Sequence, residues 1–151
     1  MNNARSLLFS TDASWAPLML RVVAGIIFIA HGAQKLFGWF GGYGLSGTGE
    51  WMASIGLQPG LPMAFLAGAG EFFGGIALIL GLLTRPAAAV LTFTMVVAIA
   101  AVHLGNGLFV SNGGYEFSLA LLAMSAALVV TGGGKLSVDR QFAHRTSASR
   151  A

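Results

Sequence analysis

The chain has no cysteine and few charged residues. Among its 151 residues are no Cys, eight Lys plus Arg, and five Asp plus Glu. The absence of cysteine excludes disulfides, thiol redox chemistry, thiolate metal sites and cysteine-ligated iron–sulfur clusters. Charged residues make up 9% of the chain and hydrophobic residues 56%, a balance that excludes an ordinary soluble domain.

Long apolar runs take the place of the missing charge, and the mean hydropathy is +0.78. A membrane-spanning helix needs ~20 mostly apolar residues. Four runs of about that length are present, at 17–37, 61–83, 86–105 and 115–131. The sequence therefore predicts an all-α integral membrane protein, a four-helix bundle in contact with the lipid bilayer and without a second domain.

The basic residues indicate which side the termini face. If the spans alternate in direction, six of these residues lie on one side of the membrane: Arg5, Arg85, Lys135, Arg140, Arg145 and Arg150. The opposite side keeps Lys35 at a helix end. Because cytoplasmic loops carry the excess of Lys and Arg, both termini are expected in the cytoplasm. The pI of about 10.0 then reflects topology, and nucleic acid is not an expected partner.

The spans also divide the chain. We expect an N-terminal cytoplasmic segment at 1–16, a membrane domain at 17–139, and a basic, mostly disordered cytoplasmic tail at 140–151. Residues 84–86 are expected to form the tight turn between the second and third spans. In the first outer loop, residues 48–55 predict a short amphipathic helix, with Trp51, Met52 and Ile55 on its apolar side. That helix is either a lid over the bundle or a helix resting among the headgroups.

Glu71 is the one ionisable residue in the apolar run 61–83. A carboxylate at membrane depth is costly unless it is paired, protonated or facing a polar cavity. At ~100° per residue, several small residues fall on its side of the helix: Ala64, Ala67, Gly68, Gly74 and Gly75. Small residues gather where another helix comes close, so Glu71 is predicted to point into the bundle.

Polar residues on the other spans suggest partners for Glu71. On the first span, one arc collects Arg21, Gly25, His31, Gly32 and Lys35. On the third, His103 shares a face with Thr92, Val96 and Ile99, and on the fourth, Glu116 heads a stripe of Ala120, Ala123 and Ala127. At ~1.5 Å per residue, five of these residues reach the outer half of the membrane. The expected ligand pocket is therefore His31, Lys35, Glu71, His103 and Glu116.

Each of these residues also has a purely structural explanation. Lys35 can extend to the headgroups, Glu116 can cap its helix, and His103 can bond to a carbonyl. Glu71 and His31 can be a pair that holds two helices together. Arg21 is interpreted as a separate inner anchor that reaches the cytoplasmic interface. No HExxH-like spacing occurs, so no metal site is expected.

Ordered motifs link these residues to a known family. The sequence reads Arg21-x-x-x-Gly25, His31-Gly32-x-x-Lys35-Leu36-Phe37-Gly38, Gly70-Glu71-x-x-Gly74-Gly75, Gly81-Leu82-Leu83-Thr84-Arg85 and Gly134-Lys135-Leu136-Ser137-Val138-Asp139. In this order and spacing the set resembles the DoxX family of small four-helix bacterial inner-membrane proteins. The resemblance covers most of residues 17–140 and implies a multi-pass protein of the bacterial inner (plasma) membrane.

The family is linked to a quinone-reducing thiosulfate oxidoreductase subunit and to membrane-associated redox-defence assemblies. The resemblance thus implies a quinone-linked oxidoreductase subunit, with His31 and Glu71 as a candidate proton relay. No flavin, haem or iron–sulfur motif is recognisable, so the cofactor is open and an electron-carrying partner is required. A structural role is expected for the remaining motif residues: Arg21, Gly25, Gly32, Gly74, Gly75 and Arg85.

Two other functions are compatible with the same residues. The chain could be a non-catalytic scaffold or assembly factor whose buried polar residues specify helix packing. It could also hold a pathway for protons or small solutes, although four short helices leave little room for one unless the chain forms a homo-oligomer.

Overall fold

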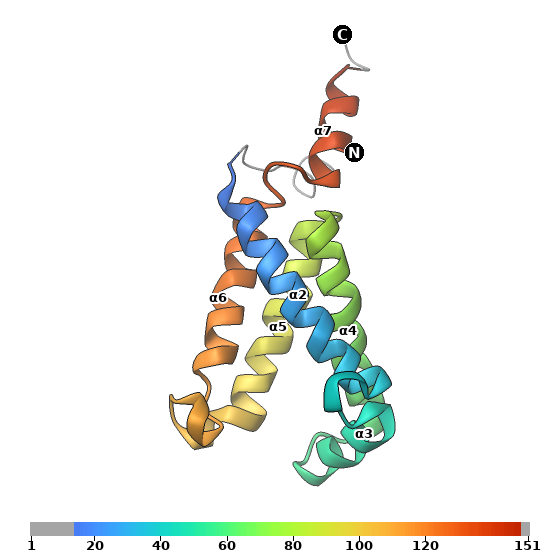
Figure 1. Ribbon diagram of the computed structural model, residues 1–151, viewed down its shortest axis with the longest axis vertical. Coiled ribbons are helices and arrows are strands. Elements are labelled where there is room, and N and C mark those ends of the chain that lie inside the picture. Colours follow the sequence, from blue (N-terminus) through green and yellow to red (C-terminus); the bar gives the residue numbers. More distant parts are fainter. Residues whose placement is uncertain (1–13, 149–151) are drawn as a thin grey trace.

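The computed structural model describes residues 14–148, which contain helices and no strand. Four long helices alternate in direction and pack side by side (Figure 1): α2 (Ala16–Phe37), α4 (Gly60–Leu80), α5 (Thr84–Ala98) and α6 (Glu116–Thr131). Helix α2 packs on α4 and α5 packs on α6, while α4–α5 and α2–α6 contacts join the two pairs. The all-α prediction is confirmed for the described residues.

Three helical stretches are long and apolar enough to cross a membrane. They are Ala16–Phe37, Gly60–Leu80 and Thr84–Asn106, the last formed by α5 with the π-helical turn η2 (Ile99–His103) and the 3₁₀ turn η3 (Leu104–Asn106). Helix α6 is apolar but has 16 residues, about 24 Å at the usual helical rise. The first segment, 1–16, lies almost wholly outside the described residues.

The turn between α4 and α5 lies three residues earlier than expected. Gly81 adopts φ +65° after α4, and the Leu82 amide donates to the Ala77 carbonyl at 3.0 Å, which closes the helix in a Schellman-type arrangement. Residues 84–86 therefore begin α5 and do not form the turn. Proline suits this first turn because it has no amide hydrogen to leave unpaired.

The first connection, at the end of the molecule far from the described termini, contains the 3₁₀ turn η1 (Trp39–Gly41) and helix α3 (Gly44–Ser54). Helix α3 begins four residues before the expected start at Thr48 and packs on α4. Its buried residues are Thr48, Gly49 and Met52. Trp51 and Ile55, expected with Met52 on the apolar side, are 41% and 38% exposed.

Glycines set the close approach of α2 and α4. A Cβ on Gly25 would lie 2.8 Å from the Gly75 carbonyl oxygen, and a Cβ on Gly32 would lie 2.7 Å from the Gly68 carbonyl oxygen. The two contacts are seven residues apart on each helix, which is close to two turns, so they repeat along one line. Gly74 faces α5 instead, where a Cβ would lie 3.1 Å from the Leu91 Cγ atom.

The end of the molecule nearest the described termini is closed by Arg21. Its Nη1 donates to the Leu78 and Ile79 carbonyls at 3.2 and 2.6 Å, and its Nη2 to those of Lys135 and Leu136 at 3.1 and 2.6 Å. Arg21 is 1% exposed, so the expectation that it extends to the interface is wrong. The carbonyls that end α4 need donors, and the guanidinium supplies them.

Asp139 fixes the α4–α5 turn from the other side. Its backbone amide donates to the Gly81 carbonyl at 2.9 Å, and its carboxylate accepts from the Leu83 and Thr84 amides at 2.7 and 2.8 Å. A carboxylate at a helix N-terminus also suits the helix dipole. Leu83 is held at φ +48°, a strained value for a side chain with a Cβ. The Asp139 contacts hold the turn in this conformation.

Asp139→Ala is expected to destabilise the fold by about 2 kcal/mol, because the buried Thr84 amide and the partly buried Leu83 amide lose their acceptor. Unfolding of the detergent-solubilised protein by SDS titration measures this. Glu50→Ala, which changes an exposed carboxylate on α3, serves as the control and is expected to have no measurable effect. Equal stability of the two variants would contradict the role assigned to Asp139.

Two expectations for the last third of the chain are wrong. Ala120 and Ala123 are exposed, and the buried side of α6 is Ser118, Leu121, Ser125 and Leu128. The tail, expected to be mostly disordered, forms helix α7 (Val138–Ala148). Helix α7 begins at Val138, next to the Asp139 contacts that attach it to the turn.

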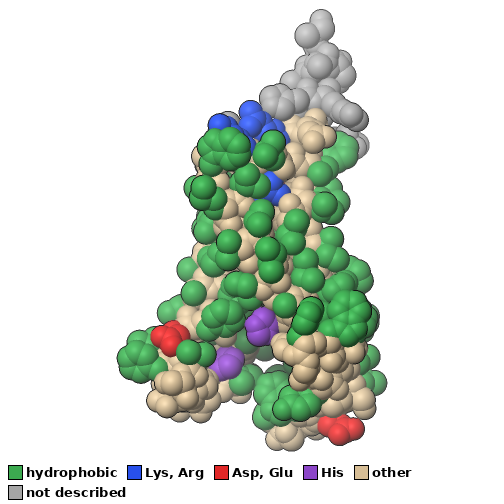
Figure 2. All heavy atoms as spheres, viewed as in Figure 1, with side chains coloured by type: hydrophobic (Ala, Val, Ile, Leu, Met, Phe, Trp, Pro, Cys, Tyr) green, Lys and Arg blue, Asp and Glu red, His purple; other side chains and the backbone are tan. Residues whose placement is uncertain are grey.

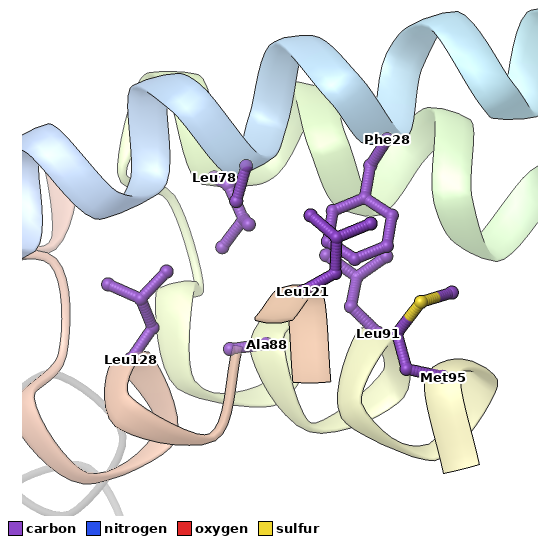
Figure 3. Packing of buried hydrophobic residues seen from close by; sticks show 8 residues of the cluster. Phe28, Leu78, Ala88, Leu91, Met95, Leu121 and Leu128 are labelled. Atoms are coloured by element: carbon purple, nitrogen blue, oxygen red, sulfur yellow. The ribbon is translucent and has the colours of Figure 1, made fainter. Parts of the chain in front are cut away.

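An apolar core lies where the four long helices meet. Figure 3 shows side chains of this core converging from α2, α4, α5 and α6. The core residues are Ala24, Phe28, Leu78, Ala88, Leu91, Met95, Leu121 and Leu128. All are at most 5% exposed. This core joins the α2–α4 pair to the α5–α6 pair, and it fixes the distance between the two pairs at the height of the core residues.

Candidate functional site

A cavity of about 840 Å³ opens where the helix pairs separate. It lies at the end far from the described termini, and Figure 2 shows the surface hollowed there, with histidine side chains beside the hollow. The walls come from α2, α3, α4, α5, η2 and α6 and are mostly apolar. Four of the five expected pocket residues line it: His31, Lys35, Glu71 and His103.

Lys35 and Glu71 form an ion pair between α2 and α4, with 2.6 Å between Nζ and Oε2. The Glu71 side chain is 4% exposed and that of Lys35 is 23% exposed. The glycine contact at Gly32 and Gly68 lies about one turn away and brings the two helices close enough for this pair. Each charge neutralises the other in apolar surroundings, where an unpaired charge is costly.

His31 lies one helical turn before Lys35 on the same wall. Its ring stands 5.9 Å from the Phe117 ring of α6, in a tilted arrangement. Among the described residues, the ion-pair partner of Glu71 is Lys35 rather than His31. The pair that the sequence left open between Glu71 and His31 is therefore replaced by Glu71–Lys35, and the imidazole faces the cavity without that constraint.

His103 reaches the cavity through the π-helical turn η2. The sequence placed His103 on one face with Thr92, Val96 and Ile99, but this face is not the buried side of α5. The buried residues of α5 are Thr84, Ala88, Leu91 and Met95, and Val96 is 47% exposed. A π turn holds one extra residue, so it rotates the later part of the helix by about one position, ~100°. That rotation turns residue 103 toward the direction that residue 102 would take in an uninterrupted α-helix.

The His103 ring is oriented by the outer loop. Its Nδ1 lies 2.7 Å from the Gly113 carbonyl oxygen. A carbonyl accepts hydrogen bonds, so Nδ1 carries the proton and Nε2 is the nitrogen free to accept one from a ligand. The carbonyl contact considered from the sequence is present, and His103 lines the cavity as well.

Glu116 was expected in the pocket and lies outside it, and Arg21 lies outside it as expected. The Glu116 Oε1 atom accepts from the Val110 amide at 2.6 Å, which holds the 3₁₀ turn η4 (Val110–Asn112), and Glu116 is not part of the cavity wall. Arg21 is at the opposite end. The structure thus groups His31, Lys35, Glu71 and His103 and leaves Glu116 with the loop.

Trp51 and Met52 of α3 line the cavity, and both were expected on the apolar side of the short helix in the first outer loop. Phe93, Ser118 and Leu121 also line it and were not expected from the sequence. Apolar periodicity marks a buried side but does not show where a core gives way to a cavity, so no sequence signal was available for them. Among residues 14–148, no three His, Asp or Glu side chains are grouped as a metal site.

Comparisons with known proteins give several relatives. The Bacillus subtilis (strain 168) protein named "Putative oxidoreductase CatD" is 38% identical over 122 residues, which are 81% of this chain and 83% of that protein. Inner membrane protein YqjF of Escherichia coli K12 is 32% identical over 128 residues, with 82% and 88% coverage. Inner membrane protein YphA of the same organism is 27% identical over 146 residues, with 93% and 100% coverage.

No solved structure gives a significant match to the chain. The family comparison is direct, because residues 16–104 match DoxX. That range includes α2, α3, α4, α5 and η2, and with them His31, Lys35, Glu71 and His103. The resemblance of the ordered motifs is thereby confirmed, and the chain belongs to the DoxX family.

Proposed function

We propose that this inner-membrane protein is the membrane subunit of a quinone-linked oxidoreductase system and binds a quinone headgroup in the cavity. One observation carries the proposal. A cavity of about 840 Å³ with largely apolar walls is lined by an ammonium, a carboxylate and two imidazoles. Ligand sites commonly combine a large apolar surface with a few convergent polar groups.

These groups suit the chemistry of a quinone. Reduction of a quinone to a quinol takes up two electrons and two protons, and negative charge develops on the two oxygens until each is protonated. The Lys35 ammonium has donors beyond the one given to Glu71 and can stabilise that charge. His31 and Glu71 are the candidate proton relay. The two electrons come from a partner protein that carries a flavin or an iron–sulfur cluster.

The charge distribution supports four spans with both termini in the cytoplasm. Lys and Arg side chains gather at the end of the molecule where α2 begins, as Figure 2 shows, and the cavity opens at the other end. By the positive-inside rule, the basic end is cytoplasmic and the cavity lies in the outer half of the membrane. The 16 residues of α6 make the fourth span, completed by the loops at its ends.

The apolar core favours binding over passage through the protein. Phe28, Met95 and Leu121 belong both to the cavity wall and to the core. From Glu71 to Leu78, seven residues along α4, the path is ~10 Å long, and Leu78 is completely buried. The buried hydroxyl of Ser125 donates to the Leu121 carbonyl of its own helix at 2.8 Å. A proton or polar solute would therefore have to cross a largely apolar layer, which is costly.

His31→Ala is expected to weaken binding of a tail-less benzoquinone by about fivefold, as the loss of one hydrogen bond would. Trp51, at the cavity wall, reports binding by quenching of its fluorescence in a variant that lacks Trp15 and Trp39. Lys135→Met, at the opposite end, is the control and should bind as the parent does. Absence of quenching in the parent protein, together with absence of quinone in extracts of native preparations, would overturn the proposal.

A second candidate function is a scaffold for a redox assembly. The observation that favours it is the Lys35–Glu71 pair, which joins α2 to α4 and can serve packing alone. The two functions differ in what happens when the pair is replaced by apolar residues of similar size. A scaffold keeps its partners, whereas a quinone site loses its ligand.

A further inference from the structure

The cavity has a second opening, toward the side of the molecule. Leu66 of α4 and Val90 and Phe93 of α5 line the cavity and are 63%, 50% and 69% exposed. Helices α4 and α5 approach closely at Gly70, where a Cβ would lie 3.4 Å from the Val90 Cγ1 atom, and they diverge toward the end of the molecule far from the described termini (Figure 1). In the membrane this surface faces hydrocarbon, because both helices are long and apolar enough to span. The cavity is therefore open to the lipid interior as well as at its outer end.

An apolar groove continues from this opening along α4 and α5. It has a volume of about 350 Å³ and runs past Gly70, Gly74 and Ala77 to Leu82 and Pro86. A Cβ on Gly70 or Gly74 would lie 3.4 Å from Val90 or 3.1 Å from Leu91, so these glycines let α5 approach α4 along the groove. No charged residue lines the groove. Over residues 69–77 of α4 its length is ~12 Å. Val90 lines both the groove and the cavity, so the two are adjacent.

We propose that the cavity takes its ligand sideways from the bilayer and that the ligand is a tailed amphiphile. Its polar head lies beside Lys35 and His31, and its hydrocarbon tail leaves between Leu66, Val90 and Phe93 into the groove. The quinone identity of the head rests on the proposed function, whereas the sideways path rests on the two openings. Small water-soluble ligands use the outer end instead.

The tail contributes little binding energy, because lipid is as apolar as the groove. Its path matters sterically: a ligand with a tail can bind only if the opening leaves room for it. Val90→Phe narrows that opening where the groove and cavity meet. Val130→Phe is the matched control, since Val130 is 73% exposed on α6 and lines neither space.

The experiment uses the full chain in nanodiscs, with Trp15 and Trp39 replaced by Phe so that quenching reports on Trp51. The probes are 2,3-dimethoxy-5-methyl-1,4-benzoquinone and its decyl derivative. The apparent Kd of each probe is compared between variants, so that the partition of the probe into the nanodisc lipid cancels from the ratio. For Val90→Phe we expect the apparent Kd of the decyl probe to rise about tenfold, and that of the tail-less probe to stay within about twofold. Val130→Phe should match the parent with both probes.

Two results overturn the inference and leave the proposed function standing. One is unchanged binding of the decyl probe in Val90→Phe, and the other is equal weakening of both probes. If neither quinone binds the parent, the proposed function fails, and a decyl-chain nitroxide without a quinone head is then titrated. Quenching that is lost in Val90→Phe and kept in Val130→Phe supports the sideways path for an amphiphile of another kind. Equal quenching in both variants, or none in the parent, overturns it.

Discussion

Lys35→Met is expected to lower the free energy of unfolding by about 4 kcal/mol, because it leaves the Glu71 carboxylate without its partner in apolar surroundings. Glu71→Leu should cost less, about 3 kcal/mol, since the Lys35 side chain stays 23% exposed and keeps contact with the cavity. SDS titration of the protein in mixed micelles, followed by tryptophan fluorescence, measures both.

The double variant Lys35→Met/Glu71→Leu is expected to recover to within about 1 kcal/mol of the parent, because an apolar pair replaces both charges at once. It also separates the two proposed functions. A quinone site loses quenching of Trp51 although the fold is restored, whereas a scaffold keeps its co-purifying partners. Lys135→Met and Glu50→Leu are the controls for the single changes. Additive losses in the double variant would contradict a direct Lys35–Glu71 interaction.

Gly32→Ala is expected to destabilise the protein by about 3 kcal/mol, the upper end of ordinary overpacking. A Cβ there would lie 2.5 Å from the Phe72 amide nitrogen and 2.7 Å from the Gly68 carbonyl oxygen, and backbone atoms cannot rotate away. Helices α2 and α4 must then move apart near the Lys35–Glu71 pair. Quinone affinity is expected to fall together with the free energy of unfolding, so the two quantities are measured on the same samples.

Gly105→Ala is the matched control for Gly32→Ala. A Cβ on Gly105 would have no atom within 4 Å, and its effect on stability should be below about 1 kcal/mol. A Gly32→Ala protein as stable as Gly105→Ala would show that α2 and α4 do not meet at this glycine. It would also remove the physical reason for the short Lys35–Glu71 distance.

Helix α4 was predicted well from the sequence. Its buried residues include Ala64, Gly68, Glu71 and Gly75, as the helical period and the cost of an exposed carboxylate in lipid require. The family could also be identified from the sequence, because each of its motifs is a short continuous segment of the chain. Both inferences depend on local spacing alone, which the sequence contains in full.

Helices α5 and α6 were predicted less well, for an identifiable reason. In α6, nearly every residue is apolar or small, so the helical period does not single out a buried side, and Ser118 and Ser125 face inward. In α5, the π turn η2 changes the direction of His103, and such a turn has no clear sequence signal. Arg21 was correctly kept apart from the pocket, but its burial was not foreseen, because its acceptors come from residues 57 to 115 positions away.

By itself, then, the sequence determined which segments are apolar helices, that Glu71 turns inward, and the family to which the chain belongs. Only the tertiary structure decided that Glu71 pairs with Lys35, that Glu116 holds a loop, and that a cavity forms where the helix pairs separate. The physical reason is that helical periodicity sets the direction of a side chain about its own axis. Its partner depends on how closely two helices approach, and here that distance is set by glycine contacts between residues far apart in the chain.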